Sequence, residues 1–305
     1  KNHAASLLDH TPRFRFFTLH GKQHIENLFE ILDLFCDAGL RLTRDEAFLL
    51  GCAVCVHDLG MVVPLTNLDT DALFQGKPQP VEPTDLEKQL RDTHHERVSD
   101  YVKNHFGFLV SLGLTTGDCS IVQEISRCHR RTDLDTVSGA AKSLGALLRT
   151  IDELDISPSR APQTILSEHF EEMDGTSCWH WFKHSITDRR ITRHNVEIVL
   201  GAMPQLIFKI AVHPPDSSSI PYWLRQIRRP VYRVLFDEGA ARIICETWGL
   251  QVSVVEAPEL SQECDTGERW KRIENKALSA GRKVVLVIDD EARKLVDLFL
   301  PLMMT

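Results

Sequence analysis

The sequence lacks several features that would define its class at once. It has no signal peptide and no apolar run near about 18 residues, so neither secretion nor a membrane-spanning helix is predicted. It has no internal repeats. Its eight cysteines follow no regular spacing, and the pair Cys52 and Cys55 has no second C-x-x-C beside it. Core packing is therefore favoured over zinc or redox chemistry, and reduced thiols suit a cytoplasmic protein.

Positive charge is also in short supply. The net charge of −8 argues against general coating of nucleic acid, although it leaves room for a local basic groove. Hydrophobic residues make up 43% and charged residues 26%, the balance of a soluble globular protein. The 305 residues allow one large or two ordinary domains. Because the chain starts at Lys1 and is still apolar over Leu295–Met304, we expect a fragment of a longer polypeptide.

The pattern of apolar residues changes near residue 160. Before it, apolar residues recur at helical spacing, which indicates a bundle of helices. The helices predicted there are Lys22–Ala38, Ala47–Val56, Thr84–Phe106, one capped by Asp118, and Ser138–Asp155. After it, helical and alternating patterns are mixed. We therefore predict a mainly α fold, with a helical domain over residues 1–160 and a smaller α+β domain over residues 161–305.

The second region contains both helix and strand signals. Helical patterns cover Pro162–Trp181 and Pro221–Trp248, the latter bent at Pro230. Alternating residues predict a hairpin formed by His194–Leu200 and Leu206–Val212. Further strands are expected at Gln251–Val255 and Lys283–Ile288, followed by a closing helix over Asp289–Leu302.

The most informative stretch is the doublet His57-Asp58, which follows an apolar helix. Thr43 and Glu46 form a capping box at the start of that helix, which indicates that the helix is buried. Burying adjacent His and Asp side chains is costly unless their charge is compensated. A divalent metal would do this, because imidazole and carboxylate are both good ligands. The alternative is a helix end where Asp58 pairs with a backbone group or an arginine.

Other helices carry polar groups on their apolar faces, namely His24, His94, His129 and Asp152. One core histidine is ordinary, but this set within one helical bundle favours a metal site built from facing helices. His95 lies roughly 100° further round its helix than His94, so His94 is expected to matter more. His20 precedes His24 by four residues, but the intervening Gly21 weakens the prediction that they share a helix.

The ordered pattern H…HD…D resembles the HD-domain superfamily of metal-dependent phosphohydrolases. His24 matches the first histidine, His57-Asp58 the doublet and Asp152 the last aspartate. His94 or His95, together with His129, match the second-metal histidines of dinuclear members. The resemblance implies an HD-domain bundle with two divalent metals bridged by Asp58, and a metal-bridging hydroxide as nucleophile. Mixed imidazole and carboxylate ligands favour Mn²⁺, Fe²⁺, Co²⁺ or Ni²⁺.

A finer resemblance lies in the residues around the first histidine and the doublet. Leu19–His24 and His57–Met61 are similar to a subgroup often linked to heat-shock-chaperone-type ATPases in bacterial defence-like proteins. This implies a fused or associated ATPase domain as a partner. Alarmone hydrolases carry an acidic pair after the doublet, whereas Met61 and Val62 stand there in this chain. Alarmone hydrolysis is therefore disfavoured.

The substrate implied by the resemblance is a nucleotide or nucleic-acid phosphoester. The candidates to clamp its phosphate are Arg97, Arg130, Arg131 and Arg149. For each, a solvated helix face or a structural ion pair is the alternative. The arginines within 225–233 could line a nucleic-acid groove or face solvent. The competing hypothesis for the whole chain is a metal-stabilised regulatory or interaction module without catalysis.

Overall fold

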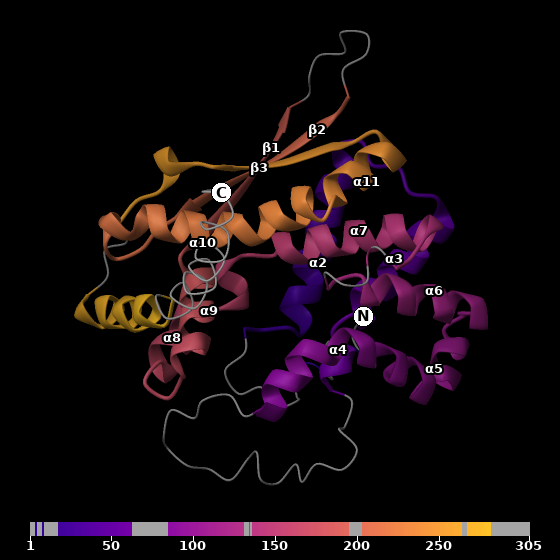
Figure 1. The fold of residues 1–305 in the computed structure, drawn as a ribbon, viewed down its shortest axis with the longest axis horizontal. Coiled ribbons are helices and arrows are strands. Elements are labelled where there is room, and N and C mark those ends of the chain that lie inside the picture. Colours follow the sequence, from indigo (N-terminus) through magenta and orange to yellow (C-terminus); the bar gives the residue numbers. More distant parts are fainter. Residues whose placement is uncertain are drawn as a thin grey trace, which may run out of the picture.

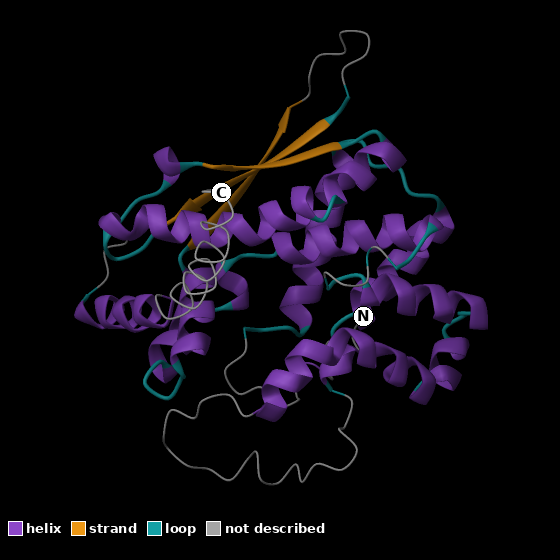
Figure 2. Ribbon diagram, in the orientation of Figure 1, coloured by secondary structure: helices purple, strands orange, loops and turns teal. Residues whose placement is uncertain are grey.

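A computed structural model shows a mainly helical protein with one small sheet (Figure 2). It describes residues 18–62, 85–130, 136–194, 203–263 and 267–281, with single residues at 4, 8 and 134, and only the backbone at 85–92 and 190–194. The described helices include none that combines the length and apolar character needed to cross a membrane. The predicted fold class, mainly α with a smaller α+β part, is confirmed.

The first half forms a bundle of helices. Its elements are α2 (Lys22–Asp37), α3 (Arg44–Val56), η1 (Leu59–Met61), α4 (Asp85–Asn104), α5 (Phe106–Ser111), α6 (Thr116–Arg127) and α7 (Gly139–Leu154). The capping box of Thr43 and Glu46 opens α3 as predicted. The start of α6 differs from the prediction, because Thr115 is the N-cap and Asp118 completes a capping box as its N3 residue.

Helix α7 is the central element of this bundle, and α2, α3 and α6 all pack against it. Its buried side chains include Leu144, Leu147, Leu148 and Ile151. A Cβ placed at Gly145 would lie 2.6 Å from the Cβ of Cys128, so glycine allows α6 and α7 to approach closely. Cys52 and Cys55 pack against the core, as predicted from their isolated spacing.

The second half combines helices with a three-stranded sheet. Its elements are η3 (Pro158–Arg160), α8 (Gln163–His169), α9 (Gly175–Ser185), β1 (Thr187–His194), β2 (Gln205–Val212), η4 (Ser217–Ser219), α10 (Ile220–Tyr232), η5 (Arg233–Asp237), α11 (Ala240–Trp248), β3 (Gln251–Glu256) and η6 (Pro258–Leu260), and residues 268–281 are helical. Strand β2 is central, antiparallel to β1 and parallel to β3. In Figure 1 the sheet lies across α10 and α11, on the opposite side from α4 and α5.

Two predictions for this half need correction. The helix expected over 221–248 is three elements, because the π-helical turn η5 ends at Asp237 and Gly239 adopts a left-handed φ of 75°. Pro230 lies inside α10 and does not end it. The hairpin is present, but Thr187–His194 is the strand that pairs with Gln205–Val212. Residues 195–200, the strand at 283–288 and the helix at 289–302 lie outside the described residues.

The described halves share one hydrophobic core. The buried cluster runs from α2 and α7 to β2 and α10, and the rings of Phe35 and Phe208 lie 5.9 Å apart across it. Helix α10 packs against both β2 and β3. The division into domains at residue 160 stays a prediction.

Candidate metal centre

The doublet lies where α3 ends and η1 begins. His57 is 1% and Asp58 4% exposed, so both polar side chains are buried as predicted. A Cβ on Gly60 would lie only 1.8 Å from the backbone oxygen of His94. Because only glycine leaves this space, η1 packs directly against α4 and brings the doublet beside the histidine on that helix.

The first group of ligating atoms joins α2, α3 and α7. Nε2 of His24 lies 3.3 Å from Nε2 of His57. Oδ1 of Asp152 lies 3.4 Å from Nε2 of His24 and 3.9 Å from Nε2 of His57. Three residues from three helices therefore direct one donor atom each toward a common point.

A second group lies on the other side of Asp58. Nε2 of His94 lies 3.4 Å from Oδ1 of Asp58 and 2.7 Å from Nε2 of His129. The rings of His57 and His129 are 5.3 Å apart, so the two groups adjoin. Asp58 is placed between them, with Oδ1 toward the second group and Oδ2 within 3.3 Å of His57.

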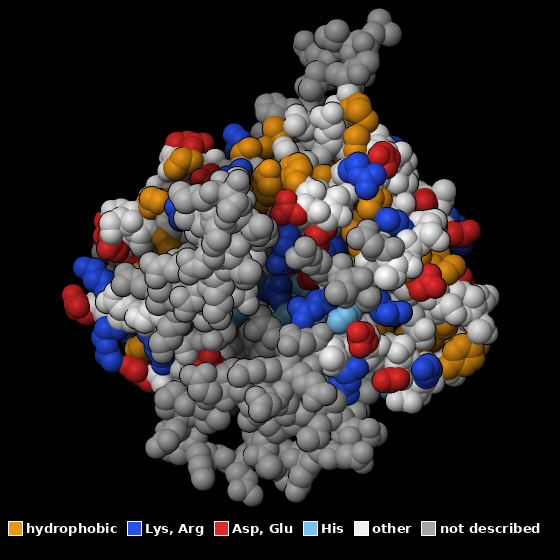
Figure 3. All heavy atoms as spheres, in the orientation of Figure 1, with side chains coloured by type: hydrophobic (Ala, Val, Ile, Leu, Met, Phe, Trp, Pro, Cys, Tyr) orange, Lys and Arg blue, Asp and Glu red, His pale blue; other side chains and the backbone are white. Residues whose placement is uncertain are grey.

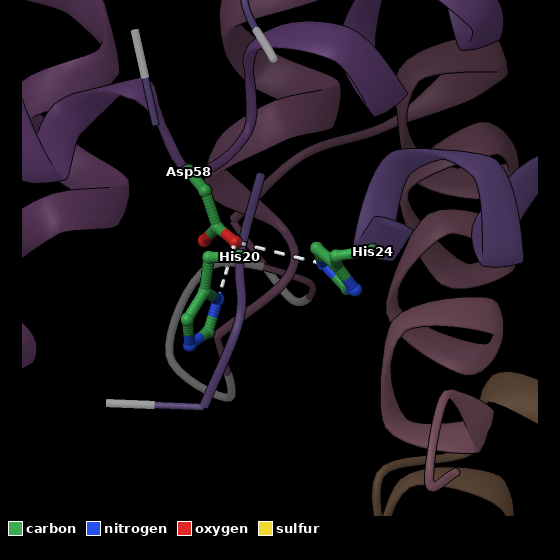
Figure 4. A group of neighbouring side chains, drawn as sticks. All are labelled: His20, His24 and Asp58. Atoms are coloured by element: carbon green, nitrogen blue, oxygen red, sulfur yellow. Dashed lines mark hydrogen bonds and ion pairs between the residues drawn. The ribbon is translucent and has the colours of Figure 1, made fainter. Parts of the chain in front are cut away.

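The structure adds His20 to the candidate metal ligands, although Gly21 argued against its sharing a helix with His24. Its Nδ1 lies 2.9 Å from Oδ2 of Asp58, and Oδ2 is also 3.6 Å from Nε2 of His24 (Figure 4). His20 precedes α2 in the chain, so helical periodicity could not have placed it. The described residues thus contain three groups that could hold a metal ion: His20, His24 and Asp58; His24, His57 and Asp152; Asp58, His94 and His129.

Buried partners fix the orientation of these imidazoles. Nδ1 of His24 lies 2.7 Å from Oδ2 of Asp155, and Asn27 donates a hydrogen bond of 2.8 Å to the other oxygen of that carboxylate. Nδ1 of His57 lies 3.0 Å from the carbonyl of Val54. Nδ1 of His129 lies 2.5 Å from the carbonyl of Ser126. Metal-binding histidines commonly use their second nitrogen in this way.

The ring orientations of His24 and His57 show whether their free nitrogens could bind a cation. A carbonyl oxygen only accepts, so Nδ1 of His57 carries the proton, and the carboxylate of Asp155 favours the same tautomer for His24. With these tautomers, two uncharged rings would direct an Nε2 lone pair at each other across 3.3 Å. Two lone pairs repel unless a proton or a metal ion lies between them. The donor set, imidazole nitrogens with carboxylates close by, suits a divalent transition metal.

Electrostatics support the same view. Burial lowers the pKa of His57, but the carboxylates of Asp58 and Asp152 outweigh burial and raise it to about 9. Burial raises the pKa of Asp58, but His57 and His20 hold it well below its usual range. Burial, reinforced by His94, keeps the pKa of His129 well below its ordinary value. In the metal-free protein a proton on His57 therefore supplies the positive charge between the carboxylates.

The other residues predicted for the site are His95 and four arginines. His95 is buried and its ring lies 6.0 Å from the ring of His129, but it belongs to none of the three groups, whereas His94 does. Arg149 is buried, and its Nε lies 2.5 Å from Glu238, the structural ion pair weighed as its alternative. Arg97 and Arg130 are half-buried, and Arg131 lies outside the described residues. Their roles in substrate binding stay predictions.

The sequence did not predict three further residues of the site, Asp155, Asn27 and Arg160. Asp155 stands three residues after Asp152, and Asn27 three after His24, each at helical spacing from a predicted ligand. That spacing was a usable signal for both. Arg160, whose Nε lies 3.7 Å from Asp155 and whose Nη2 lies 3.1 Å from His20, belongs to η3 and had no such signal.

Comparison with known proteins gives one result that bears on this site. No curated protein and no solved structure matches the chain. The family model HD-CE matches residues 14–200, which cover α2 to β1 and every residue of the three groups. The match extends over more than half of the sequence, and so the chain belongs to the HD-CE family.

Proposed function

We propose that this protein is a metal-dependent phosphohydrolase that cleaves a nucleotide or nucleic-acid phosphoester. The observation that carries the proposal is the pair of Nε2 atoms of His24 and His57, which face each other across 3.3 Å with carboxylates on two sides. Without a metal the arrangement needs a buried proton on one of the two rings, whereas a divalent cation would satisfy both nitrogens and the carboxylates together. Membership of the HD-CE family supports the same conclusion.

The centre holds two metals, which are Mn²⁺, Fe²⁺, Co²⁺ or Ni²⁺. His24, His57, Asp58 and Asp152 are the ligands of the first. Asp58, His94 and His129 are the ligands of the second. Divalent metals in such centres supply a nucleophile at neutral pH and stabilise the charge that develops on the phosphate oxygens.

The chain itself contributes orientation and the exclusion of water. Asp58 presents one oxygen to each group, so it sets the spacing between the two sites. Asp155 and the carbonyls of Val54 and Ser126 hold three rings with Nε2 toward the centre. All four histidines of the two groups are at most 8% exposed, which strengthens electrostatic interactions with a charged substrate.

The alternative is a metal-stabilised regulatory module. That hypothesis would be supported if the two histidines expected to bind the second metal pointed away from each other. Instead, Nε2 of His94 and Nε2 of His129 lie 2.7 Å from each other, beside Asp58. This convergence favours a second metal and hence hydrolysis. The link to a fused or associated ATPase stays a prediction.

The test is metal content of the purified protein combined with a panel of phosphoesters. The panel contains deoxynucleotides, cyclic nucleotides and single-stranded DNA and RNA, each tested with Mn²⁺ and Ni²⁺. Asp58→Asn should lose bound metal and hydrolysis together. The matched control, Asp100→Asn on the exposed side of α4, should lose neither. Full metal occupancy without hydrolysis of any ester would favour the regulatory module.

A further inference from the structure

The outer face of α10 and η5 carries cations and aromatic rings together. Tyr232 and Phe236 are each 43% exposed, and the side chain of Arg233 beside them is 46% exposed. Further arginines on these elements are Arg225, Arg228 and Arg229. The opposite face is buried through Trp223, Ile227 and Val231. We call the exposed set from Arg225 to Phe236 the arginine–aromatic face.

The aromatic rings of this face are arranged as a stacking surface. The ring centroids of Tyr232 and Phe236 lie 4.6 Å apart. The guanidinium of Arg228 lies 5.4 Å from the Tyr232 ring, on the side of the preceding helical turn. Phe236 follows Tyr232 by four residues, a spacing that places two side chains side by side on a helix. Phe236 lies in the π-helical turn η5, and such turns often occur at functional sites. Exposed rings flanked by arginines are the usual surface on which unpaired bases stack.

This face is joined to the helix that carries Asp152. Glu238 lies 2.5 Å from Nε of Arg149 through one oxygen and 3.3 Å from Nε of Arg233 through the other. Arg149 precedes Asp152 by three residues on α7, a rise of about 4.5 Å. A buried carboxylate therefore links Arg233 of the arginine–aromatic face to Arg149 on α7, the helix that carries Asp152.

Lys and Arg side chains are visible on the side of the molecule where α10 and α7 meet, with some Asp and Glu side chains beside them (Figure 3). Figure 3 shows a hollow at the centre of this side of the molecule, below the place where α10 and α7 meet in Figure 1. Lys and Arg side chains gather in and around it, with His side chains at its edge, and apolar side chains lie above it. The four arginines of the arginine–aromatic face complement a polyanion, although the whole chain has a net charge of −8.

We propose that the arginine–aromatic face binds single-stranded nucleic acid and leads it to the metal centre. Bases stack on Tyr232 and Phe236, while the arginines hold the phosphates. The inference rests on the proposed function and names its substrate class. The face extends about 16 Å from Arg225 to Phe236, which exceeds the needs of one nucleotide. Duplexes are disfavoured because their bases stack on one another and leave no ring face free inside the helix.

The experiment measures the affinity of the metal-loaded full chain for a labelled single strand of about 12 nucleotides by fluorescence anisotropy. The strand has phosphorothioate linkages, which resist cleavage. Tyr232→Ala combined with Phe236→Ala should weaken binding at least ~10-fold. Tyr232→Phe, which keeps the ring, should bind like the unaltered chain. The control pair, Phe106→Ala with Phe108→Ala, removes rings that are 37% and 41% exposed on α5 and should change nothing. Arg233→Ala should reduce the slope of log affinity against log salt by about 0.7.

Several outcomes would overturn the inference. Unchanged affinity in the double aromatic variant would do so, as would a mononucleotide or a duplex that binds as tightly as the strand. Hydrolysis of a small phosphodiester, bis(p-nitrophenyl) phosphate, by the unaltered chain tests the proposed function separately. A chain that hydrolyses this ester but binds no strand rejects the inference alone. A chain that binds the strand through both rings but hydrolyses nothing supports the face and rejects the hydrolase.

Discussion

Replacing Asp155 by asparagine tests how the centre is held in place, because the change keeps the shape of the side chain and removes one acceptor. Two donors converge on the carboxylate, since Nδ1 of His24 lies 2.7 Å from one oxygen and Asn27 donates to the other at 2.8 Å. An asparagine offers one oxygen and one NH₂ group. Whichever way the amide is turned, one of the two donors faces another donor.

The size of the effect follows from the role of Asp155 as the orienting partner of His24. Loss of such a partner costs about 10- to 100-fold in metal affinity. This corresponds to about 1.4–2.8 kcal/mol. Unfolding free energy should also fall, by about 1–3 kcal/mol, because a buried donor loses its partner.

The assay is competition for Mn²⁺ or Ni²⁺ between the protein and a fluorescent chelator, with urea unfolding measured on the same preparations. The matched control is Asp174→Asn, since Asp174 is 5% exposed but caps α9 and belongs to none of the three metal groups. It should keep full metal affinity. If Asp155→Asn also binds metal with unchanged affinity, the reasoning that Asp155 orients His24 is refuted.

Three further predictions concern the same centre. His57→Ala should remove at least one equivalent of metal per chain and abolish hydrolysis, measured by elemental analysis and phosphoester turnover; full retention of metal would contradict its role. His94→Ala should lose activity and metal, while His95→Ala should keep both. The reason is that Nε2 of His94 lies 3.4 Å from Asp58, whereas His95 belongs to none of the three ligand groups. The reverse result would exchange their roles. In the metal-free protein, the pKa of His57 rises from 6.5 to about 9, so its contribution to stability is complete below pH 6.5 and is lost as pH rises to about 9. The urea midpoint should fall across that window by the equivalent of ~3 kcal/mol, and His57→Gln should flatten the dependence.

Residues on regular helices were predictable from sequence because one periodicity fixes both the helix and the face it buries. His24, His94 and His129 were expected on apolar faces, and the structure brings all three to one region with the doublet. The same reasoning separated His94 from His95 by about 100° of helix, and in the structure Nε2 of His94 lies 3.4 Å from Oδ1 of Asp58.

Residues that reach the centre from irregular segments were not predictable. His20 precedes the first turn of α2, so its approach to Asp58 depends on the path of a loop. Arg160, which contacts both His20 and Asp155, lies on the short helix η3 after α7. The contact between Arg160 and His20 joins parts of the chain 140 residues apart, and no local pattern encodes it.

The break between α10 and α11 shows a related limit. Apolar spacing over 221–248 fits one helix, but Gly239 has the conformational freedom to adopt a φ of 75° and η5 inserts a wider turn. Sequence therefore predicted the helical character of this segment and its arginines. It did not predict that Tyr232 and Phe236, neighbours at a spacing of four residues, would both be exposed.

The central claim is that metal ions lie between the facing imidazoles of α2, α3, α4 and the end of α6. The most direct measurement is anomalous scattering from crystals grown with saturating Mn²⁺, collected on both sides of the metal edge. We predict two peaks about 4 Å apart, as in other two-metal sites. One should lie between His24 and His57 and the other between His94 and His129, with Asp58 contacting both. A single peak, with His94 and His129 hydrogen-bonded elsewhere, would reject the two-metal mechanism, and the absence of any peak at these histidines would contradict the metal centre itself.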